Sequence, residues 1–276
     1  MIELHFYKMQ GTGNDFVVID NRDGKLSLDE IIEHTPQLCD RIFGIGADGF
    51  IALNSPQLPD TDYTMIYRNS DGSDAGMCGN GARCLARLAW QLGMGTNFTF
   101  NVHDAIYKAS VNEDNGLISI SFPDTLQPKW ISIDDLKLLQ IYPGTEHLVL
   151  HTDDKKLAEE EELNSLGRKI RNHPVINPPG SNVNFISIRP DKSIQLQTYE
   201  RGVEGLTQAC GTGAIASALA TDFITSADAN ELRNIQVTVK GGILNVQFKR
   251  NEATGNYEEI KLTGPAAVVY EGTFHL

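Results

Sequence analysis

The chain has 276 residues, with 36 acidic against 23 basic side chains and a formal net charge of −13 at pH 7. This charge argues against nucleic acid or an anionic membrane surface as a partner, and the length suggests two domains of ordinary size. A secretory signal and an apolar stretch long enough to span a membrane are both missing from the sequence, and four cysteines in such a chain fit a reducing compartment. We therefore expect a cytoplasmic protein.

The first half of the chain reads as short strands and two helices. Ser27 and Glu30 form a capping box that starts a short helix, which Pro36 is expected to interrupt. A second helix is expected directly after Cys78. Alternating or β-branched runs predict strands at 2–9, 16–20, 50–53, 63–69, 98–102, 105–111 and 116–122.

The second half repeats this style after a proline-marked boundary, which divides the chain into expected domains 1–123 and 124–265. An amphipathic helix is expected over roughly 155–172, with acids early and bases late as the helix dipole favours. A second, almost wholly apolar helix follows Cys210 and should be buried. Strands are expected near 145–151, 182–186, 194–199, 257–263 and 266–271, with a hairpin about Gly241 and Gly242. Short strands with a central helix in each half indicate the α+β class.

A short motif occurs twice, about half the chain length apart. Residues 77–84 read Met-Cys-Gly-Asn-Gly-Ala-Arg-Cys, and residues 209–214 read Ala-Cys-Gly-Thr-Gly-Ala. Each copy places a cysteine, Cys78 or Cys210, before a glycine-rich turn that opens a helix. A helix start offers unpaired backbone N–H groups and a positive dipole end, which lower the pKa of a thiol. Two such starts suggest a duplicated domain and two reactive sulfurs.

Several chemistries are open to these cysteines. They could be small buried apolar residues, but their matched helix-start contexts argue against that. A metal site needs paired Cys or His spacings that the sequence lacks, and a nucleophilic triad would use one cysteine with one histidine. General acid–base catalysis fits two equivalent groups, one thiolate taking a proton from a carbon and one thiol returning a proton to its other face. The substrate would be an α-amino acid whose carboxylate binds N–H groups near Gly79-Asn80 and Gly211-Thr212, and no cofactor signature is found.

Two further features have alternative interpretations from the residues alone. Asn14 follows two glycines, where the backbone can approach a ligand closely, but the spacing alone favours a turn asparagine. Glu200 and Arg201 end a predicted strand just before the second motif. They could be functional or an exposed ion pair.

At these residues the sequence resembles the diaminopimelate epimerases, a pyridoxal-independent family that interconverts LL- and meso-diaminopimelate. The resemblance runs the length of the chain and rests on residues 8–16, Asn69 with 71–73 leading to 78–84, residues 182–185, and 200–202 leading to 207–213. It implies two pseudo-symmetric β-roll halves, each around a central helix, with a last strand at 266–276 returning to the first half. It also implies a homodimer that uses neither metal nor cofactor.

The resemblance also assigns roles to single residues. Cys78 and Cys210 would be the acid–base pair, and Arg201 would bind the distal carboxylate as a bidentate fork. Glu200 would accept a hydrogen bond from an ammonium group, and His147 would be an auxiliary residue. The remaining substrate contacts would be Asn14, Asn69 and Asn182, together with Gly79, Asn80, Gly211 and Thr212 at the helix starts.

This chain departs from the family pattern in two places. The family usually shows Asn-Pro-His where this chain has Thr145-Glu146-His147, so a substrate-contacting asparagine is replaced by Thr145. The stretch 203–206 is one residue longer than in many relatives, and Leu206 stands where an acid is common. Both changes concern the distal end of the substrate. A racemase of another amino acid such as histidine is therefore an alternative, as is a binding protein or phenazine-type isomerase of the same fold.

Overall fold

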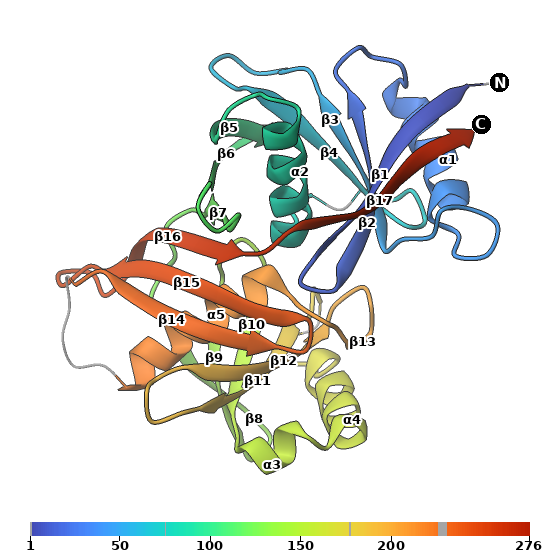
Figure 1. Cartoon of the computed structure of the whole chain (residues 1–276). Helices are drawn as coiled ribbons and strands as arrows, with labels where there is room; N and C mark the ends of the chain where they lie inside the picture. Colours follow the sequence, from blue (N-terminus) through green and yellow to red (C-terminus); the bar gives the residue numbers. More distant parts are fainter. Residues whose placement is uncertain (1, 75, 177, 226–230) are drawn as a thin grey trace. The chain divides into compact units, whose positions relative to one another are not determined.

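The computed structural model describes residues 2–74, 76–176, 178–225 and 231–276, and divides the chain into two compact units. One unit comprises Met1–Ile120 together with Gly264–Leu276, and the other comprises Ser121–Thr263. We call them the N-terminal and C-terminal units. Each is an α+β structure with a helix packed against its strands (Figure 1), as the sequence predicts.

The N-terminal unit contains a sheet of seven strands in the order β17–β1–β2–β3–β4–β5–β6. The pairs β2/β3 and β4/β5 are parallel, and the other neighbours are antiparallel. A parallel pair needs a crossover connection, and α1 and α2 supply the two crossovers. The strands are β1 (Glu3–Gly11), β2 (Asn14–Asn21), β3 (Gly49–Asn54), β4 (Tyr63–Asn69), β5 (Asn97–Val102), β6 (Ala105–Val111) and β17 (Ala267–His275). Strand β7 (Ile118–Ser121) contains the chain position, between Ile120 and Ser121, at which the first unit ends and the second begins.

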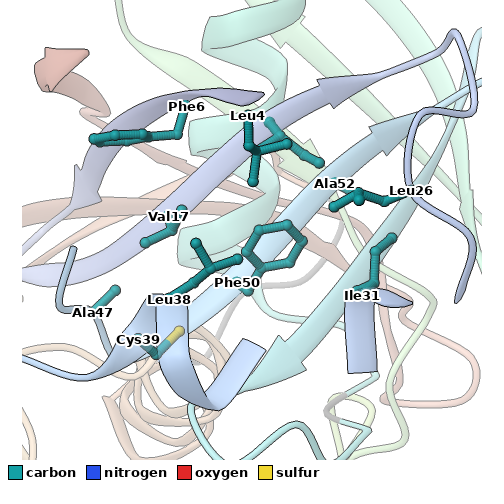
Figure 2. Close-up of a cluster of buried hydrophobic side chains, with 11 residues drawn as sticks. Leu4, Phe6, Val17, Leu26, Ile31, Leu38, Cys39, Ala47, Phe50 and Ala52 are labelled. Atoms are coloured by element: carbon teal, nitrogen blue, oxygen red, sulfur yellow. The ribbon is translucent and has the colours of Figure 1, made fainter. Parts of the chain in front are cut away.

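The two helices of this unit cover opposite faces of the sheet. Helix α1 (Leu28–Cys39) packs against a cluster that includes Val17 and Phe50, as Figure 2 shows. Side chains alternate along a strand, so Phe16 and Ile51 point to the other face, where α2 (Gly79–Gln91) lies. Asn14, two residues before Phe16 in β2, therefore points to the face on which α2 lies.

Helix α1 begins at the predicted capping box but does not break at its proline. Ser27 accepts a hydrogen bond from the Glu30 N–H, and the Glu30 carboxylate accepts one from the Ser27 N–H. Pro36 lies inside the helix, contrary to the expected interruption. Thr35, the residue before the proline, donates its hydroxyl to the Ile31 carbonyl within the same helix. The helix then ends three residues after the proline.

The C-terminal unit repeats the same arrangement. Its strands run in the order β8–β9–β10–β11–β12–β14–β15–β16, with β10/β11 and β12/β14 parallel and the other neighbours antiparallel. The short β13 (Gly205–Leu206) also pairs with β12. The first seven strands follow the sequence of pairings seen in the N-terminal unit, which makes the two halves pseudo-symmetric. The strands are β8 (Lys129–Ile133), β9 (Leu136–Ile141), β10 (His147–His151), β11 (Asn182–Ile188), β12 (Ile194–Glu200), β14 (Arg233–Val239), β15 (Gly242–Arg250) and β16 (Tyr257–Gly264).

The helices of this unit differ from the prediction in one respect. The expected single helix over 155–172 is two helices, α3 (Asp154–Leu157) and α4 (Glu160–Arg171). Asp153 caps the first, and Leu157 at its end is buried in the core, so the chain turns before three acidic residues start α4. Helix α5 (Gly211–Thr225) is buried along most of its length, as its apolar sequence predicts. Within the described part of the chain, none of the helices is long and apolar enough to span a membrane.

Candidate active site

Cys78 lies at the start of α2, as the first motif predicts. It is the N-cap residue, and its sulfur accepts a hydrogen bond from the Gly81 N–H at 3.4 Å. A side chain at Gly81 would not fit easily, because a Cβ there would come within 2.7 Å of the Ile51 Cδ1 atom. The glycine-rich turn therefore lets the helix start approach the sheet and brings backbone donors to the sulfur.

Asn14, the first residue of β2, is held next to Cys78 with a fixed amide orientation. Its Nδ2 donates to the Asp48 carboxylate at 2.7 Å, and its Oδ1 accepts from the Asn80 Nδ2 at 3.3 Å. The Asn80 Oδ1 in turn accepts from the Arg83 guanidinium at 2.9 Å. Because an ionised carboxylate can only accept and a guanidinium can only donate, the two ends of this chain fix both amides. The Asn14 Oδ1 consequently faces the Cys78 sulfur, at 3.9 Å.

Arg83 is fully buried one helical turn after Cys78. Its guanidinium donates to the Thr12 hydroxyl at 2.6 Å and to the backbone carbonyls of Gly79 and Pro265, each at 3.3 Å. Burial lowers the pKa of Arg83 to about 10, against the attraction of the Cys84 and Cys78 sulfurs. The group therefore remains charged at neutral pH and places a positive charge beneath the helix start.

A cluster of four charged side chains holds the other end of this chain. Asp15 accepts hydrogen bonds from Lys8 and from Arg41, and Arg41 also donates to Asp48 at 2.7 Å. Burial of Asp15 opposes ionisation, but the hydrogen bonds from Arg41 and Lys8 outweigh it and lower the pKa of Asp15 to about 2. Asp15 therefore stays ionised at neutral pH and holds Arg41, which in turn fixes the Asp48 carboxylate to which Asn14 donates.

Asn69, the last residue of β4, takes part in a local turn. Its Nδ2 donates to the Ser73 hydroxyl at 3.0 Å, and its backbone N–H donates to the Ser73 carbonyl. Asn69 therefore lies at the strand end that leads into the Cys78 turn. Its predicted contact with substrate stays a prediction.

Cys210 stands before α5 as the second motif predicts, and its residue is 7% exposed. Its sulfur lies 3.7 Å from the Thr212 hydroxyl, and that hydroxyl lies 2.9 Å from the Nε2 atom of His147. A Cβ at Gly213 would lie 2.6 Å from the Asn184 Oδ1 and 3.0 Å from the Thr198 hydroxyl. The second glycine of each motif thus permits close packing at the helix start.

His147, the first residue of β10, is fully buried behind Thr212. Its Nδ1 lies 3.0 Å from the Asn184 Nδ2, and the Asn184 Oδ1 accepts from the Thr198 hydroxyl at 2.9 Å. Burial lowers the pKa of His147 to about 3, and the nearby charge of Arg201 acts in the same direction. His147 is therefore neutral at physiological pH.

Arg201 and Asn182 form a second group beside this histidine. The Asn182 Oδ1 accepts from the Arg201 N–H at 2.8 Å, and the Asn182 Nδ2 lies 3.5 Å from the His147 Nε2. The Arg201 guanidinium donates to Glu146 at 2.9 Å and to the Thr145 hydroxyl at 3.0 Å. Arg201 thus forms its ion pair with Glu146, whereas the alternative interpretation of this strand end paired Arg201 with Glu200. Glu200 itself is the last residue of β12.

Sequence reasoning missed several residues that the structure connects to these cysteines. Arg83 was noted as part of the motif without a role. Asn184 and Thr198 lie within predicted strands, which give them no separate role, and Asp48 lies between predicted elements. A signal was present for Asn184, because a buried strand with polar residues at both 182 and 184 places them on one face, and buried polar groups need partners. Among the described residues there is no group of three or more His, Cys, Asp or Glu side chains that could hold a metal ion.

Comparison with solved structures identifies the fold. A phenazine biosynthesis protein of the PhzF family from Bacillus anthracis superimposes with a TM-score of 0.75, at 13% identity and with 100% of each chain covered. A hydroxyproline epimerase from Agrobacterium vitis gives a TM-score of 0.73 at 14% identity, covering 99% of this chain and 93% of that chain. At these identities the similarity concerns the fold, and the chain has the pseudo-symmetric α+β fold of these proteins.

Sequence comparison is more specific. The family profile described as diaminopimelate epimerase matches residues 6–121 and 139–269. The diaminopimelate epimerase of Flavobacterium psychrophilum is 38% identical over 271 residues, which cover 98% of this chain and 100% of that protein. The enzyme of that name from Aquifex aeolicus is 35% identical, with 98% and 97% covered. The chain belongs to the diaminopimelate epimerase family, which confirms the resemblance read from its motifs.

Proposed function

We propose that the protein epimerises LL-diaminopimelate to meso-diaminopimelate and so serves lysine and cell-wall precursor synthesis. Membership of the family supports this activity, and it makes the protein an isomerase. The observation that carries the proposal is the occurrence of a cysteine at each of two matched helix starts, one at the central helix of each unit. General acid–base chemistry on one carbon needs such a pair.

The proposed reaction moves one proton off the α-carbon and another proton onto it. A thiolate removes the α-proton from one face, and the bonding electrons remain on the carbon as a carbanion. The other sulfur, as a thiol, donates its proton to the opposite face, so the two cysteines exchange protonation states in each turnover. Backbone N–H groups near Gly79-Asn80 and Gly211-Thr212 bind the α-carboxylate and stabilise the developing negative charge. This proposed reaction requires neither a cofactor nor a metal.

Recognition of the rest of the substrate is assigned to polar side chains at the strand ends. Arg201 binds the distal carboxylate, and Glu200 accepts a hydrogen bond from an ammonium group. Asn14, Asn69 and Asn182 complete the contacts, and His147 supports them from behind. The pairing of Arg201 with Glu146 is the observation that keeps a second substrate class under consideration, because Glu146 occupies part of the guanidinium that a distal carboxylate would use.

The test is an assay of proton exchange without added cofactor. Incubation with LL-diaminopimelate in deuterated water should introduce deuterium at the α-carbon and form the meso isomer. Cys78→Ala and Cys210→Ala should each reduce epimerisation by roughly a hundredfold or more, since a lone thiol serves one face only. Cys39→Ala is the control, because Cys39, the last residue of α1, is buried in the core cluster.

Near-normal epimerisation by either cysteine variant would refute the two-thiol mechanism. Equal or better turnover of L-histidine or another ordinary amino acid in a parallel panel would refute the assigned substrate and support the racemase alternative. A requirement for pyridoxal phosphate would refute the cofactor-independent chemistry.

We also propose a cytoplasmic homodimer without nucleic-acid or membrane partners, in keeping with the family resemblance and with the net charge of −13. Its domains would be 1–123 and 124–265, with 266–276 returning to the first. Sedimentation equilibrium that gives the mass of one chain at micromolar concentration would contradict the dimer.

A further inference from the structure

The orientation of the Asn184 amide is fixed by its surroundings. Its Nδ2 lies 3.0 Å from the backbone carbonyl of Leu148, which can only accept a hydrogen bond. Its Oδ1 accepts from the Thr198 hydroxyl, and the whole side chain is buried, so no water competes. Rotating the amide by a half turn would place two oxygens, from Asn184 and Leu148, against each other. The NH₂ group therefore faces His147.

This orientation determines the tautomer of His147. The Asn184 NH₂ group donates, so the His147 Nδ1 must accept and carries no hydrogen. A neutral ring then has its hydrogen on Nε2, and the low pKa that burial imposes keeps the ring neutral. The Nε2–H donates to the Thr212 hydroxyl oxygen at 2.9 Å. The Asn182 Nδ2 is more distant from Nε2, at 3.5 Å, and also donates to the Glu146 carbonyl at 3.2 Å.

The Thr212 hydroxyl oxygen accepts from the His147 N–H, which leaves the single hydrogen of this hydroxyl pointing away from the histidine. Its hydrogen is therefore available to the Cys210 sulfur at 3.7 Å. A sulfur that accepts hydrogen bonds is stabilised as the thiolate rather than as the thiol. The charged pair Glu146 and Arg201 is bonded to the same network through Asn182.

We propose that Asn184 and His147 are positioning residues that fix the Thr212 hydroxyl as a hydrogen-bond donor to Cys210, so that Cys210 is the thiolate base of the resting enzyme. The proposal rests on the proposed function, to which it adds an assignment of the proton-accepting sulfur. The backbone N–H groups of the helix start remain for the substrate carboxylate. The relay Asn184–His147–Thr212–Cys210 lies wholly within the C-terminal unit.

The first experiment observes the tautomer directly. Long-range ¹H–¹⁵N correlation spectra of the substrate-free protein, with His147 identified by comparison with His147→Gln, should show the Nε2–H pattern. That pattern should persist from about pH 5 to about pH 8, because a ring with so low a pKa does not protonate there. An Nδ1–H or doubly protonated pattern at neutral pH would overturn the proposal.

The second experiment measures the thiolate without using substrate. Burial raises the pKa of both Cys39 and Cys84 to about 12. In a Cys78→Ala variant, ultraviolet thiolate absorbance below about pH 9.5 therefore reports Cys210 alone. The blank is the same protein with Cys210→Ala added. Thr212→Val keeps the shape of the side chain but removes the hydroxyl, and should raise the titration midpoint by about one pH unit, a roughly tenfold loss of thiolate.

Thr212→Ser is the matched control. It keeps the hydroxyl, and its midpoint should remain within about 0.3 pH unit of the parent. A midpoint unchanged in Thr212→Val, or raised equally in both variants, would overturn the donor role. Neither experiment requires turnover, so each can succeed even if the epimerase assay fails. In that case the relay would operate in a protein that acts on a different substrate.

Discussion

At the scale of single residues, Glu146 is the side chain that most affects the proposed binding of a distal carboxylate. Its carboxylate accepts a hydrogen bond from Arg201 at 2.9 Å. Both side chains are about one-third exposed, at 33% and 30%. An ion pair this exposed contributes at most about 1 kcal/mol, so a substrate carboxylate can displace it at a modest cost.

Replacing Glu146 by glutamine should therefore improve binding of a dicarboxylate. Glu146→Gln removes the competing charge, and we expect KM for diaminopimelate to fall by roughly two- to fivefold with kcat little changed. Steady-state kinetics measure both constants. Glu160→Gln is the matched control, because Glu160 forms an exposed pair with Lys240, also at 2.9 Å, elsewhere in the same unit, and should leave KM unchanged. A KM that rises in Glu146→Gln would mean that Glu146 supports substrate binding.

At the scale of elements, the candidate residues occupy equivalent positions in the two units. Asn14 and His147 are the first residues of β2 and β10, and Asn69 and Glu200 are the last residues of β4 and β12. These strands correspond in the pairing order, and Asn14 and His147 each lie beside the start of a central helix. The pseudo-symmetry therefore explains why polar side chains from separate parts of each half converge near a cysteine.

Much of this arrangement was readable from the sequence. The repeated cysteine–glycine motif predicted both helix starts, and β-branched alternation predicted most strands within a few residues. The two strands at 129–133 and 136–141 were missed, because exposed polar and charged residues dilute their alternation. The Asn184–His147 contact was out of reach, since it depends on the register that places Asn184 opposite Val149 in β10. Local sequence patterns predict the helices and strands, whereas contacts between strands depend on the topology of the sheet.

The second glycine of each motif gives a prediction at this scale. Gly213→Ala would drive a Cβ against the Asn184 Oδ1 and Thr198 hydroxyl, which are locked in hydrogen bonds, and should cost about 1–3 kcal/mol of stability. Gly81→Ala meets the end of the flexible Ile51 side chain and should cost less. Gly205→Ala is the control, because its nearest neighbour would be the Asn164 Oδ1 at 3.8 Å. Urea unfolding measures all three, and a Gly81 variant less stable than the Gly213 variant would contradict the argument.

At the scale of the whole molecule, each unit has its own buried cluster and its own acid-sensitive group. In the C-terminal unit, the pKa of His147 is lowered from 6.5 to about 3, so the unfolded chain binds a proton that the folded chain does not. Stability should then fall as the pH drops from about 6.5 towards 3, by up to about 1.4 kcal/mol per pH unit. In the N-terminal unit, the pKa of Asp15 is lowered from 3.8 to about 2, so its contribution is complete above about pH 4 and is lost below it.

Acid should therefore weaken the C-terminal unit before the N-terminal one. The two tryptophans allow this to be measured, because Trp90 lies in α2 of the N-terminal unit and Trp130 in β8 of the C-terminal unit. With Trp90→Phe, fluorescence of Trp130 should show urea unfolding at lower denaturant as the pH falls from about 6.5 to about 4.5. With Trp130→Phe, the Trp90 transition should hold its midpoint over that range and fall only below about pH 4. Adding His147→Gln should flatten the first profile, and Asp15→Asn the second. A Trp130 profile with the same slope in the presence and absence of His147 would show that another group controls acid stability there.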